Sequence, residues 1–346
     1  MSTARTRAKL SLFVVVIAAS AVIGASYAAV LDIAIRSELS ASSLLRGALR
    51  GIIIGVTIWS FEMFLRHGPW KKRLRQMPFL TSFSVGAIAS TAVLMAAIIV
   101  SRALLGNRGL PMAQWFSIGF LRDTVFAFVA VSALHFVIQV RRIVGGRVLT
   151  NFILGRYHRP VNEERIFMFV DIVGSTQLAQ RLGDVGAHAL ISRFFFDIAE
   201  PVLAFGGETH RYIGDEVVIT WPMGDDVANA RCIECYVAIC DLISAAGPSY
   251  QTAFGCIPKF RVGLHGGPVV AGECGDEKRE IVYFGDTVNT AKRIEQACRD
   301  FDRMMLISGD LLARMKLPPQ HHLESLGTTR LRGRNHDLAL FSLAVK

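Results

Sequence analysis

Apolar residues are concentrated in the first 140 residues of the chain, where four stretches have the character of membrane-spanning helices. A helix needs about 20 largely apolar residues to cross the hydrocarbon core of a bilayer. Residues 10–31 and 79–101 meet this requirement without a single charged residue. Residues 47–65 and 115–140 are also apolar but contain charged side chains, among them Glu62, Arg122 and Asp123. The pattern predicts a transmembrane domain of four helices over residues 1–140.

Basic residues near the ends of these stretches predict their orientation. They precede the first stretch, lie between the second and third, and follow the fourth: Arg5, Arg7, Lys9, Lys71, Lys72, Arg73, Arg75, Arg141, Arg142 and Arg147. Lysine and arginine near membrane helices stay on the cytoplasmic side. We therefore expect a multi-pass protein of the inner (plasma) membrane with both termini in the cytoplasm.

The first stretch also has features of a cleaved signal peptide, because basic residues precede it and small residues follow it. Its uncharged run is longer than the usual core of a signal peptide, and three further apolar stretches follow. Both facts favour a helix that stays in the membrane.

The net charge of +10 and the hydrophobic fraction of 52% fit this interpretation. Much of the excess positive charge lies in the clusters beside the membrane helices, where it favours anionic lipid head groups. Membrane lipid is therefore an expected partner, and nucleic acid is not.

All six cysteines lie in the second half of the chain, on the predicted cytoplasmic side, where disulfides are rare. Cys232 and Cys235 have the spacing of half a zinc site, but no second pair or histidine cluster completes one. Their segment has helical periodicity, which predicts a buried core helix.

Residues 141–160 form the predicted linker, a basic and apolar segment that contains glycines and ends at Pro160. We expect it to continue the last membrane helix and then turn. Beyond it, strands and helices alternate in the order strand, helix, strand, strand, helix, strand, with Ser175 or Thr176 as N-cap of the first helix. This order is that of a ferredoxin-like α+β sandwich, which we predict for residues 161–346.

Two aspartates stand where carboxylates could meet. Asp171 ends the first strand of this domain, and Asp215 lies in the turn between the next two strands. In the predicted fold that hairpin lies beside the first strand, so both carboxylates reach one edge of the sheet. Hard oxygen ligands of this kind suit Mg²⁺ or Mn²⁺. Taken singly, Asp171 fits a helix cap and Asp215 an ordinary hairpin turn equally well.

Backbone amides at the start of the helix after Asp171 could receive a polyphosphate, because helix N-termini favour anions. The residues concerned are Gly174, Ser175 and Thr176.

Four segments in this order and spacing carry a family resemblance: "FMFVDIVGST", "GGETHRYIGDEVV", "FRVGLHGGPVVAGECG" and "GDTVNTAKRIE". They resemble the catalytic domain of class III nucleotidyl cyclases over about residues 164–341. The resemblance implies two Mg²⁺ or Mn²⁺ ions per active site, held by Asp171, Asp215 and the backbone carbonyl of Ile172. It also implies in-line attack of the ribose 3′-hydroxyl on the α-phosphorus of the nucleotide, with release of pyrophosphate.

The same resemblance assigns roles near the end of the chain. Asn289 and Arg293 lie four residues apart and so share a helix face; they match the family's transition-state pair, which orients the ribose and holds the α-phosphate. Arg332 matches a cation that contacts the terminal phosphates, with Arg334 as the alternative.

Two positions that select the purine base depart from the family pattern. Arg211 replaces the usual lysine, and Val282 replaces an aspartate or threonine and cannot bond the adenine amino group. The guanine-selecting pair is absent as well. We predict ATP as substrate because cyclic AMP is the commonest product of bacterial members; a guanylate or mixed-specificity cyclase remains the alternative.

In this family the metal ligands and the transition-state pair come from opposite subunits, so the resemblance implies a homodimer. The sequence therefore predicts a membrane-bound adenylate cyclase that converts ATP to 3′,5′-cyclic AMP. A catalytically inactive signalling module is a further alternative. The charged residues within the membrane stretches favour a site for an unknown ligand or membrane partner, or, less simply, a transporter.

Overall fold

The computed structural model describes residues 2–36, 38–67, 77–105, 121–122, 124–126, 128–130, 132–133, 136, 155–277, 279–317, 321–330 and 337–343. The chain forms two compact units, Met1–Thr150 and Asn151–Lys346. The boundary between them falls within the predicted linker of residues 141–160.

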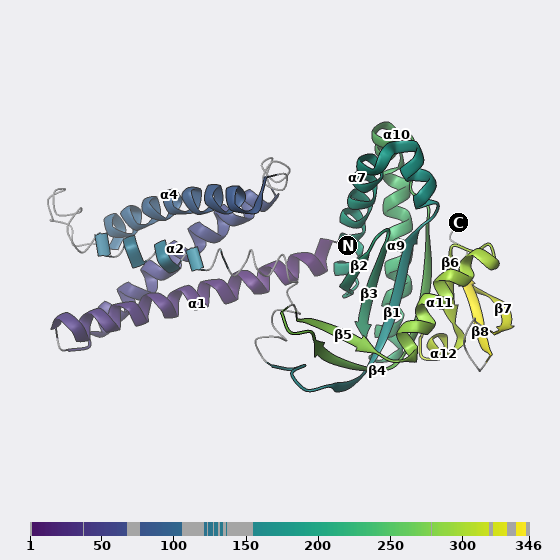
Figure 1. Ribbon diagram of the computed structural model, residues 1–346. Coiled ribbons are helices and arrows are strands. Elements are labelled where there is room, and N and C mark those ends of the chain that lie inside the picture. The colour runs from purple at the N-terminus through teal and green to yellow at the C-terminus, as the bar shows by residue number, and fades with distance from the viewer. Residues whose placement is uncertain are drawn as a thin grey trace. The chain divides into compact units, whose positions relative to one another are not determined.

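The first unit contains three long helices, α1 (Ser2–Arg36), α2 (Ala41–His67) and α4 (Phe79–Leu105) (Figure 1). Within them Phe13–Ala34, Ala41–Phe61 and Ser84–Ser101 are long and apolar enough to cross a membrane. They correspond to the first three predicted stretches. The fourth, residues 115–140, lies largely outside the described residues, so a bundle of four helices stays a prediction.

Small residues line the contact between α1 and α2. They recur at every fourth position on both helices: Ser20, Gly24 and Ala28 on α1, and Gly47, Gly51 and Gly55 on α2. A Cβ atom on Gly24 would lie 2.3 Å from the carbonyl oxygen of Gly47, and one on Gly51 would lie 2.1 Å from that of Ser20. The two backbones therefore touch, as in membrane helix pairs built on small residues four apart. The hydrophobicity and charge from which these helices were predicted do not reveal this spacing of small residues.

Replacing Gly24 with leucine is expected to separate α1 from α2, because its side chain would collide with the backbone of α2. Overpacking of this kind costs about 1–3 kcal/mol. The melting temperature of the full chain in detergent should fall, and a disulfide engineered between the two helices should form less readily. Ala19→Leu, at an exposed position on the same helix, is the control; equal effects of both substitutions would contradict the close contact.

The second unit is built on a mixed sheet of eight described strands in the order β2-β3-β1-β4-β6-β8-β7, with β5 paired to β4. Their bounds are β1 Val161–Ile172, β2 Glu208–Ile213, β3 Glu216–Pro222, β4 Phe260–Cys274, β5 Glu280–Phe284, β6 Met305–Ser308, β7 Leu323–Thr329 and β8 Leu338–Leu343. The described helices are α7 Ser175–Ala204, α8 Asp226–Asn229, α9 Arg231–Ala245, α10 Gly247–Phe254, α11 Asp286–Asp300 and α12 Gly309–Leu312.

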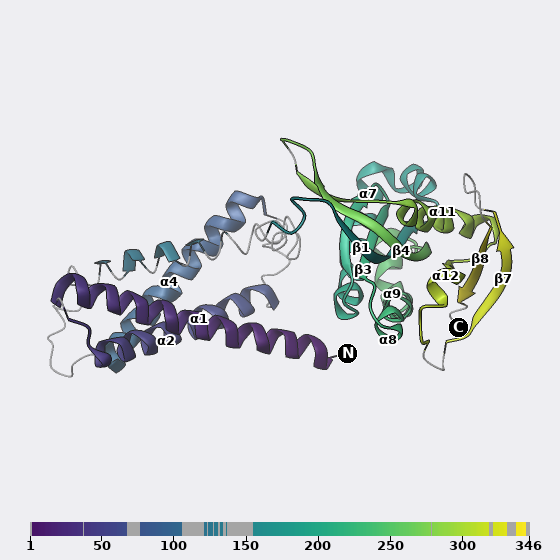
Figure 2. The same ribbon diagram turned by 90° about the horizontal axis from the view of Figure 1, so that it is seen from below.

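Helices cover both faces of this sheet, and β1 shows how the sequence directs them. Its side chains point alternately to opposite faces. Met168 and Val170 pack in the core shared with α7 and α9, which lie side by side along the sheet (Figure 1). Phe167 and Phe169 pack on the other face with Ala291 of α11, which lies beside β4 (Figure 2). The predicted α+β sandwich is confirmed in this layering and in the order of its elements.

The cysteine helix is also as predicted, since Cys232 and Cys235 are buried, free thiols of α9. Helices α9 and α10 together are apolar enough to pass for a fourth membrane span, but they bend by 57° at their junction. Tyr236 and Ile239 of α9 and Tyr250 of α10 are buried in the core of this unit. We therefore assign the pair to the folded domain.

Candidate active site

The fold brings Asp171 and Asp215 to the same edge of the sheet. Asp171 lies opposite Glu216 in the pairing of β1 with β3, and Asp215 directly precedes Glu216 in the turn from β2. Gly214 has a φ of 62°, a left-handed conformation that glycine adopts at no steric cost and that this tight turn requires. The convergence of the two carboxylates predicted from the sequence is thus present.

The charge of Asp171 is destabilised by its surroundings. Burial raises the pKa of Asp171 to about 6, with further contributions from the negative charges of Glu295 and Asp215. The positive charges of Lys292 and Arg261 offset part of this effect. Because a nearby cation would relieve the repulsion among these carboxylates, the electrostatics of this edge fit a bound divalent metal.

A second set of charges lies directly behind the two aspartates. The Lys292 ammonium of α11 donates hydrogen bonds to Glu216 of β3 and, at 3.0 Å, to the Oε2 of Glu295. Both carboxylates are nearly fully buried. This cluster joins α11 to the strand that follows Asp215. It could not be predicted from the sequence, because its members are ordinary polar residues until the fold brings them together.

The protein donors available to a metal here are few. Among the described residues, no group of three or more His, Cys, Asp and Glu side chains is placed to hold a metal ion. Asp171 and Asp215 offer two carboxylates, and Ile172 has its side chain buried in the core, so only its backbone could contribute. Two hard oxygen donors with further positions left open fit Mg²⁺ or Mn²⁺ bound jointly with phosphate and water.

The predicted phosphate-binding segment begins α7, but its cap differs from the prediction. Gly174 is the N-cap, with a φ of 71°, and no side chain caps the helix. The expectation that Ser175 or Thr176 is the N-cap was wrong, because the left-handed glycine ends the preceding turn one residue earlier. Helix N-terminal amides that no side chain caps suit an anion. Phosphate binding by Gly174, Ser175 and Thr176 remains a prediction.

Asn289 and Arg293 lie on α11, and the helix presents other residues to Asp171 of its own chain. Gly263 lets α11 approach β4 closely, since a Cβ atom there would lie 2.2 Å from the backbone nitrogen of Glu295. The charges that most affect Asp171 include Glu295 and Lys292 of this helix but not Arg293.

The predicted base-selecting residues lie on two strands that are not neighbours in the sheet. Arg211 lies on β2, and Val282 lies on β5 opposite Gly272 of β4. The guanidinium of Arg211 donates to the carboxylate of Glu280, a residue that the sequence analysis did not single out. Arg332 and Arg334, predicted to contact the terminal phosphates, lie outside the described residues.

A buried polar network joins the segment before β1 to β5. Tyr157 is only 1% exposed, and its hydroxyl donates to Glu163 at 2.9 Å. Arg165 donates to the other oxygen of Glu163 at 2.8 Å, and its guanidinium lies 4.8 Å from the centre of the Tyr283 ring. Tyr283 is the neighbour of Val282, so this network supports the strand that carries the predicted base-selecting position.

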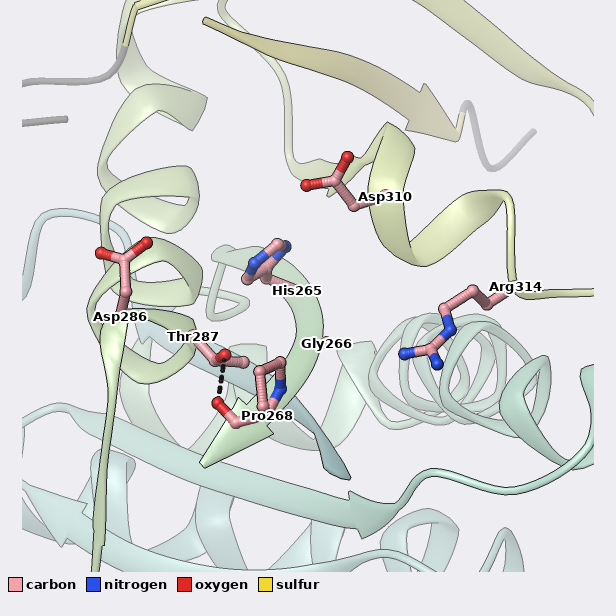
Figure 3. A pocket seen from close by; sticks show the side chains of 7 residues that line it. All are labelled: His265, Gly266, Pro268, Asp286, Thr287, Asp310 and Arg314. Carbon is pink, nitrogen blue, oxygen red and sulfur yellow. Dashed lines mark hydrogen bonds between the residues drawn. The ribbon is translucent and has the colours of Figure 1, made fainter. Parts of the chain in front are cut away.

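A separate pocket of about 400 Å³ opens beside the N-terminus of α11 (Figure 3). The Thr287 hydroxyl donates to the Pro268 carbonyl at 2.7 Å at its edge. His265 pairs with Phe167, four residues along β1 from Asp171, or about 13 Å at the rise of a strand. None of the predicted site residues lines this pocket, whose lining residues are His265, Gly266, Pro268, Asp286, Thr287, Asp310 and Arg314.

Comparisons with known proteins agree with this fold. The family described as "Adenylate and Guanylate cyclase catalytic domain" matches residues 159–344. The chain therefore belongs to the class III adenylyl and guanylyl cyclase family, as the sequence motifs predicted.

Two curated relatives come from Rhizobium meliloti. "Adenylate cyclase 2" is 43% identical over 223 residues, which cover 64% of this chain and 61% of that protein. "Adenylate cyclase 1" is 30% identical over 186 residues, covering 52% of this chain and 27% of that protein. The chain thus spans less than two thirds of either relative. The first alignment is longer than the whole segment from residue 159 onward, so it includes part of the chain before the cyclase domain.

Among solved structures, that of a bacterial light-regulated adenylyl cyclase has a TM-score of 0.54 and 19% sequence identity, covering 68% of this chain and 66% of that one. At this identity the similarity concerns the fold alone.

Proposed function

We propose that the protein is a membrane-bound adenylate cyclase that converts ATP to 3′,5′-cyclic AMP and pyrophosphate. The observation that carries the proposal is the convergence of Asp171 and Asp215 at one edge of a cyclase fold, beside further buried carboxylates. The relative of 43% identity is named an adenylate cyclase, which supports ATP as the substrate.

The residues of the chain divide the chemistry between them in this proposal. Asp171, Asp215 and the backbone of Ile172 would hold two Mg²⁺ or Mn²⁺ ions, which lower the pKa of the ribose 3′-hydroxyl and neutralise charge on the triphosphate. The amides from Gly174 to Thr176 would bind phosphate oxygens. Asn289 would orient the ribose, and Arg293 would stabilise charge on the α-phosphate during in-line attack.

The proposed active form is a homodimer with two equivalent sites. Within one chain, α11 presents Lys292 and Glu295 to Asp171, whereas Arg293 is not among the charges that most affect it. Membership of the cyclase family supports a site in which Asn289 and Arg293 serve the carboxylates of the partner subunit. Neither chain alone would then contain a complete site.

The three candidate membrane helices support attachment to the plasma membrane, with both termini in the cytoplasm on the charge pattern described above. The linker of residues 141–160 would transmit the state of the membrane unit to the catalytic unit. Tyr157, buried near the end of this linker, joins it to the network that reaches β5. Small changes in subunit orientation would matter, because misplacing reacting groups by about 1 Å can cost on the order of 100-fold in rate.

The test is a cyclase assay of the full-length protein in detergent or in vesicles with Mn²⁺ and either ATP or GTP. We expect cyclic AMP from ATP, in excess of cyclic GMP from GTP. Bound nucleotide without product from either substrate would overturn the enzymatic proposal and favour an inactive signalling module. A guanylate cyclase stays the second candidate because Val282 supplies no hydrogen-bonding group for adenine; a preference for GTP would establish it.

A further inference from the structure

Arg211, one of the two predicted base-selecting residues, forms a direct ion pair with Glu280, which joins β2 to β5. Their side chains are 41% and 37% exposed, so both groups remain accessible to a ligand. Arg211 lies four residues before Asp215 in the hairpin that carries one of the two carboxylates.

A second contact fixes the position of β5 against β2. The rings of His210 and Tyr283 meet edge to face, with their centres 4.9 Å apart. Arg165 stacks on the same Tyr283 ring from β1. Neighbouring residues of β5 and β2 thus meet in two independent contacts, and the Glu280 carboxylate is held in place by the fold as well as by Arg211.

Glu280 and Val282 lie two residues apart on β5 and so point to the same face of the strand. The Val282 side chain has neither a donor nor an acceptor. The nearest carboxylate on the same face of this strand is therefore that of Glu280. An ionised carboxylate only accepts hydrogen bonds, and a guanidinium only donates them.

We propose that Arg211 and Glu280 act together as the purine-recognition pair of this cyclase, with Glu280 in the role that Val282 cannot fill. Glu280 accepts a hydrogen bond from the 6-amino group of adenine, and Arg211 donates to the adjacent ring nitrogen. The pair supplies one acceptor and one donor, which matches the donor and acceptor on that edge of adenine. This inference rests on the proposed function, because it assigns the base-binding part of the same site.

The experiment removes each partner of the proposed hydrogen bond in turn. Full-length wild-type protein and Glu280→Ala are compared with ATP and with purine riboside triphosphate, which lacks the 6-amino group. A hydrogen bond to a charged group contributes about 1.5–3 kcal/mol, so the wild type should prefer ATP by roughly 10-fold to 100-fold in kcat/KM. In Glu280→Ala this preference should fall to about threefold or less, because both substrates then lack the bond.

Two further variants control for poor folding of Glu280→Ala and for the loss of a negative charge. Glu280→Gln keeps the side-chain volume and one acceptor oxygen, and it should retain a weakened preference even if the alanine variant folds poorly. Glu277→Ala removes the same charge from the exposed turn between β4 and β5 and should leave the preference unchanged.

The outcomes separate the inference from the function on which it rests. Equal losses with both substrates in Glu280→Ala would show that Glu280 only positions its surroundings, and would overturn its role as acceptor. An unchanged ATP preference in this variant, or no preference in the wild type, would overturn it too. A wild-type protein that forms no cyclic product from ATP or GTP would instead reject the proposed function.

Discussion

Replacing Asp171 with asparagine is expected to abolish cyclic nucleotide formation and to raise the melting temperature of the metal-free protein near pH 7. Activity should fall on the order of 1,000-fold, because asparagine is a poor ligand for the divalent cations that the site is proposed to bind. Stability should rise because Asp171 is a half-buried carboxylate placed beside the negative charges of Glu295 and Asp215. A residue selected for metal binding would here oppose folding in the absence of metal.

The pH dependence of this change in stability follows from the direction in which folding shifts the pKa of Asp171. The folded protein raises the pKa of Asp171 from an ordinary value of 3.8 to about 6, so the folded state binds the proton more tightly than the unfolded state. The contribution of Asp171 to stability therefore falls as the pH rises from about 4 to about 6 and is fully unfavourable near pH 7. Well below pH 4 the wild type and Asp171→Asn should differ little in melting temperature, because Asp171 is then protonated in both the folded and the unfolded state.

The measurement is thermal unfolding of the wild type and Asp171→Asn, each with a chelator and with Mn²⁺, at several pH values. Mn²⁺ should raise the melting temperature of the wild type near pH 7, less so near pH 5.5, and not that of the variant. Asp184→Asn, at an exposed position on α7, is the control. A lower melting temperature for metal-free Asp171→Asn, or an undiminished response of this variant to Mn²⁺, would contradict the expectation.

Co-expression of two inactive variants is expected to restore activity if the site is shared between subunits. Asp171→Asn lacks a metal ligand, and Arg293→Ala lacks the proposed transition-state cation, a loss of roughly 100-fold to 1,000-fold in rate. In a mixed dimer one site would contain both lesions and the other neither. Purified mixed dimers should thus show about half the activity of the wild type, since one of two equivalent sites is intact.

Two different affinity tags, used in succession, isolate the mixed dimers for this assay. Two copies of Asp171→Asn that carry the same two tags are the control and should remain inactive. Absence of restored activity in a mixed dimer would mean that Asp171 and Arg293 act within one chain. Failure of the two tagged chains to purify together would contradict the dimer itself.

Local chemistry explains which parts of the fold could be predicted from the sequence. The hairpin of β2 and β3 could be predicted because Gly214 and Asp215 favour a tight turn between two strands with strong β propensity. Asp171 and Asp215 could be paired in advance because strand order alone brings their backbones together. The buried thiols of α9 followed from helical periodicity.

The remaining features depend on contacts between elements distant in the sequence. Glu280 meets Arg211 only because β5 lies against β2, which is not its neighbour in the sheet. Lys292 acquires two buried partners only when α11 packs on β4 at Gly263. Gly174 is the N-cap because its backbone is left-handed. The sequence instead favoured Ser175 or Thr176, because serine and threonine are common N-cap residues. No pattern of single residues predicts such contacts.

The direct backbone contact of α1 and α2 has a mechanical consequence. Around Gly24 and Gly51 no side chain separates the two helices, so neither can slide along the other without its neighbouring larger residues colliding with the opposite backbone. The two helices therefore form one rigid unit. A stimulus that acts on the membrane unit must tilt or rotate both helices together, because a shift of α1 along α2 would produce steric clashes at the glycines.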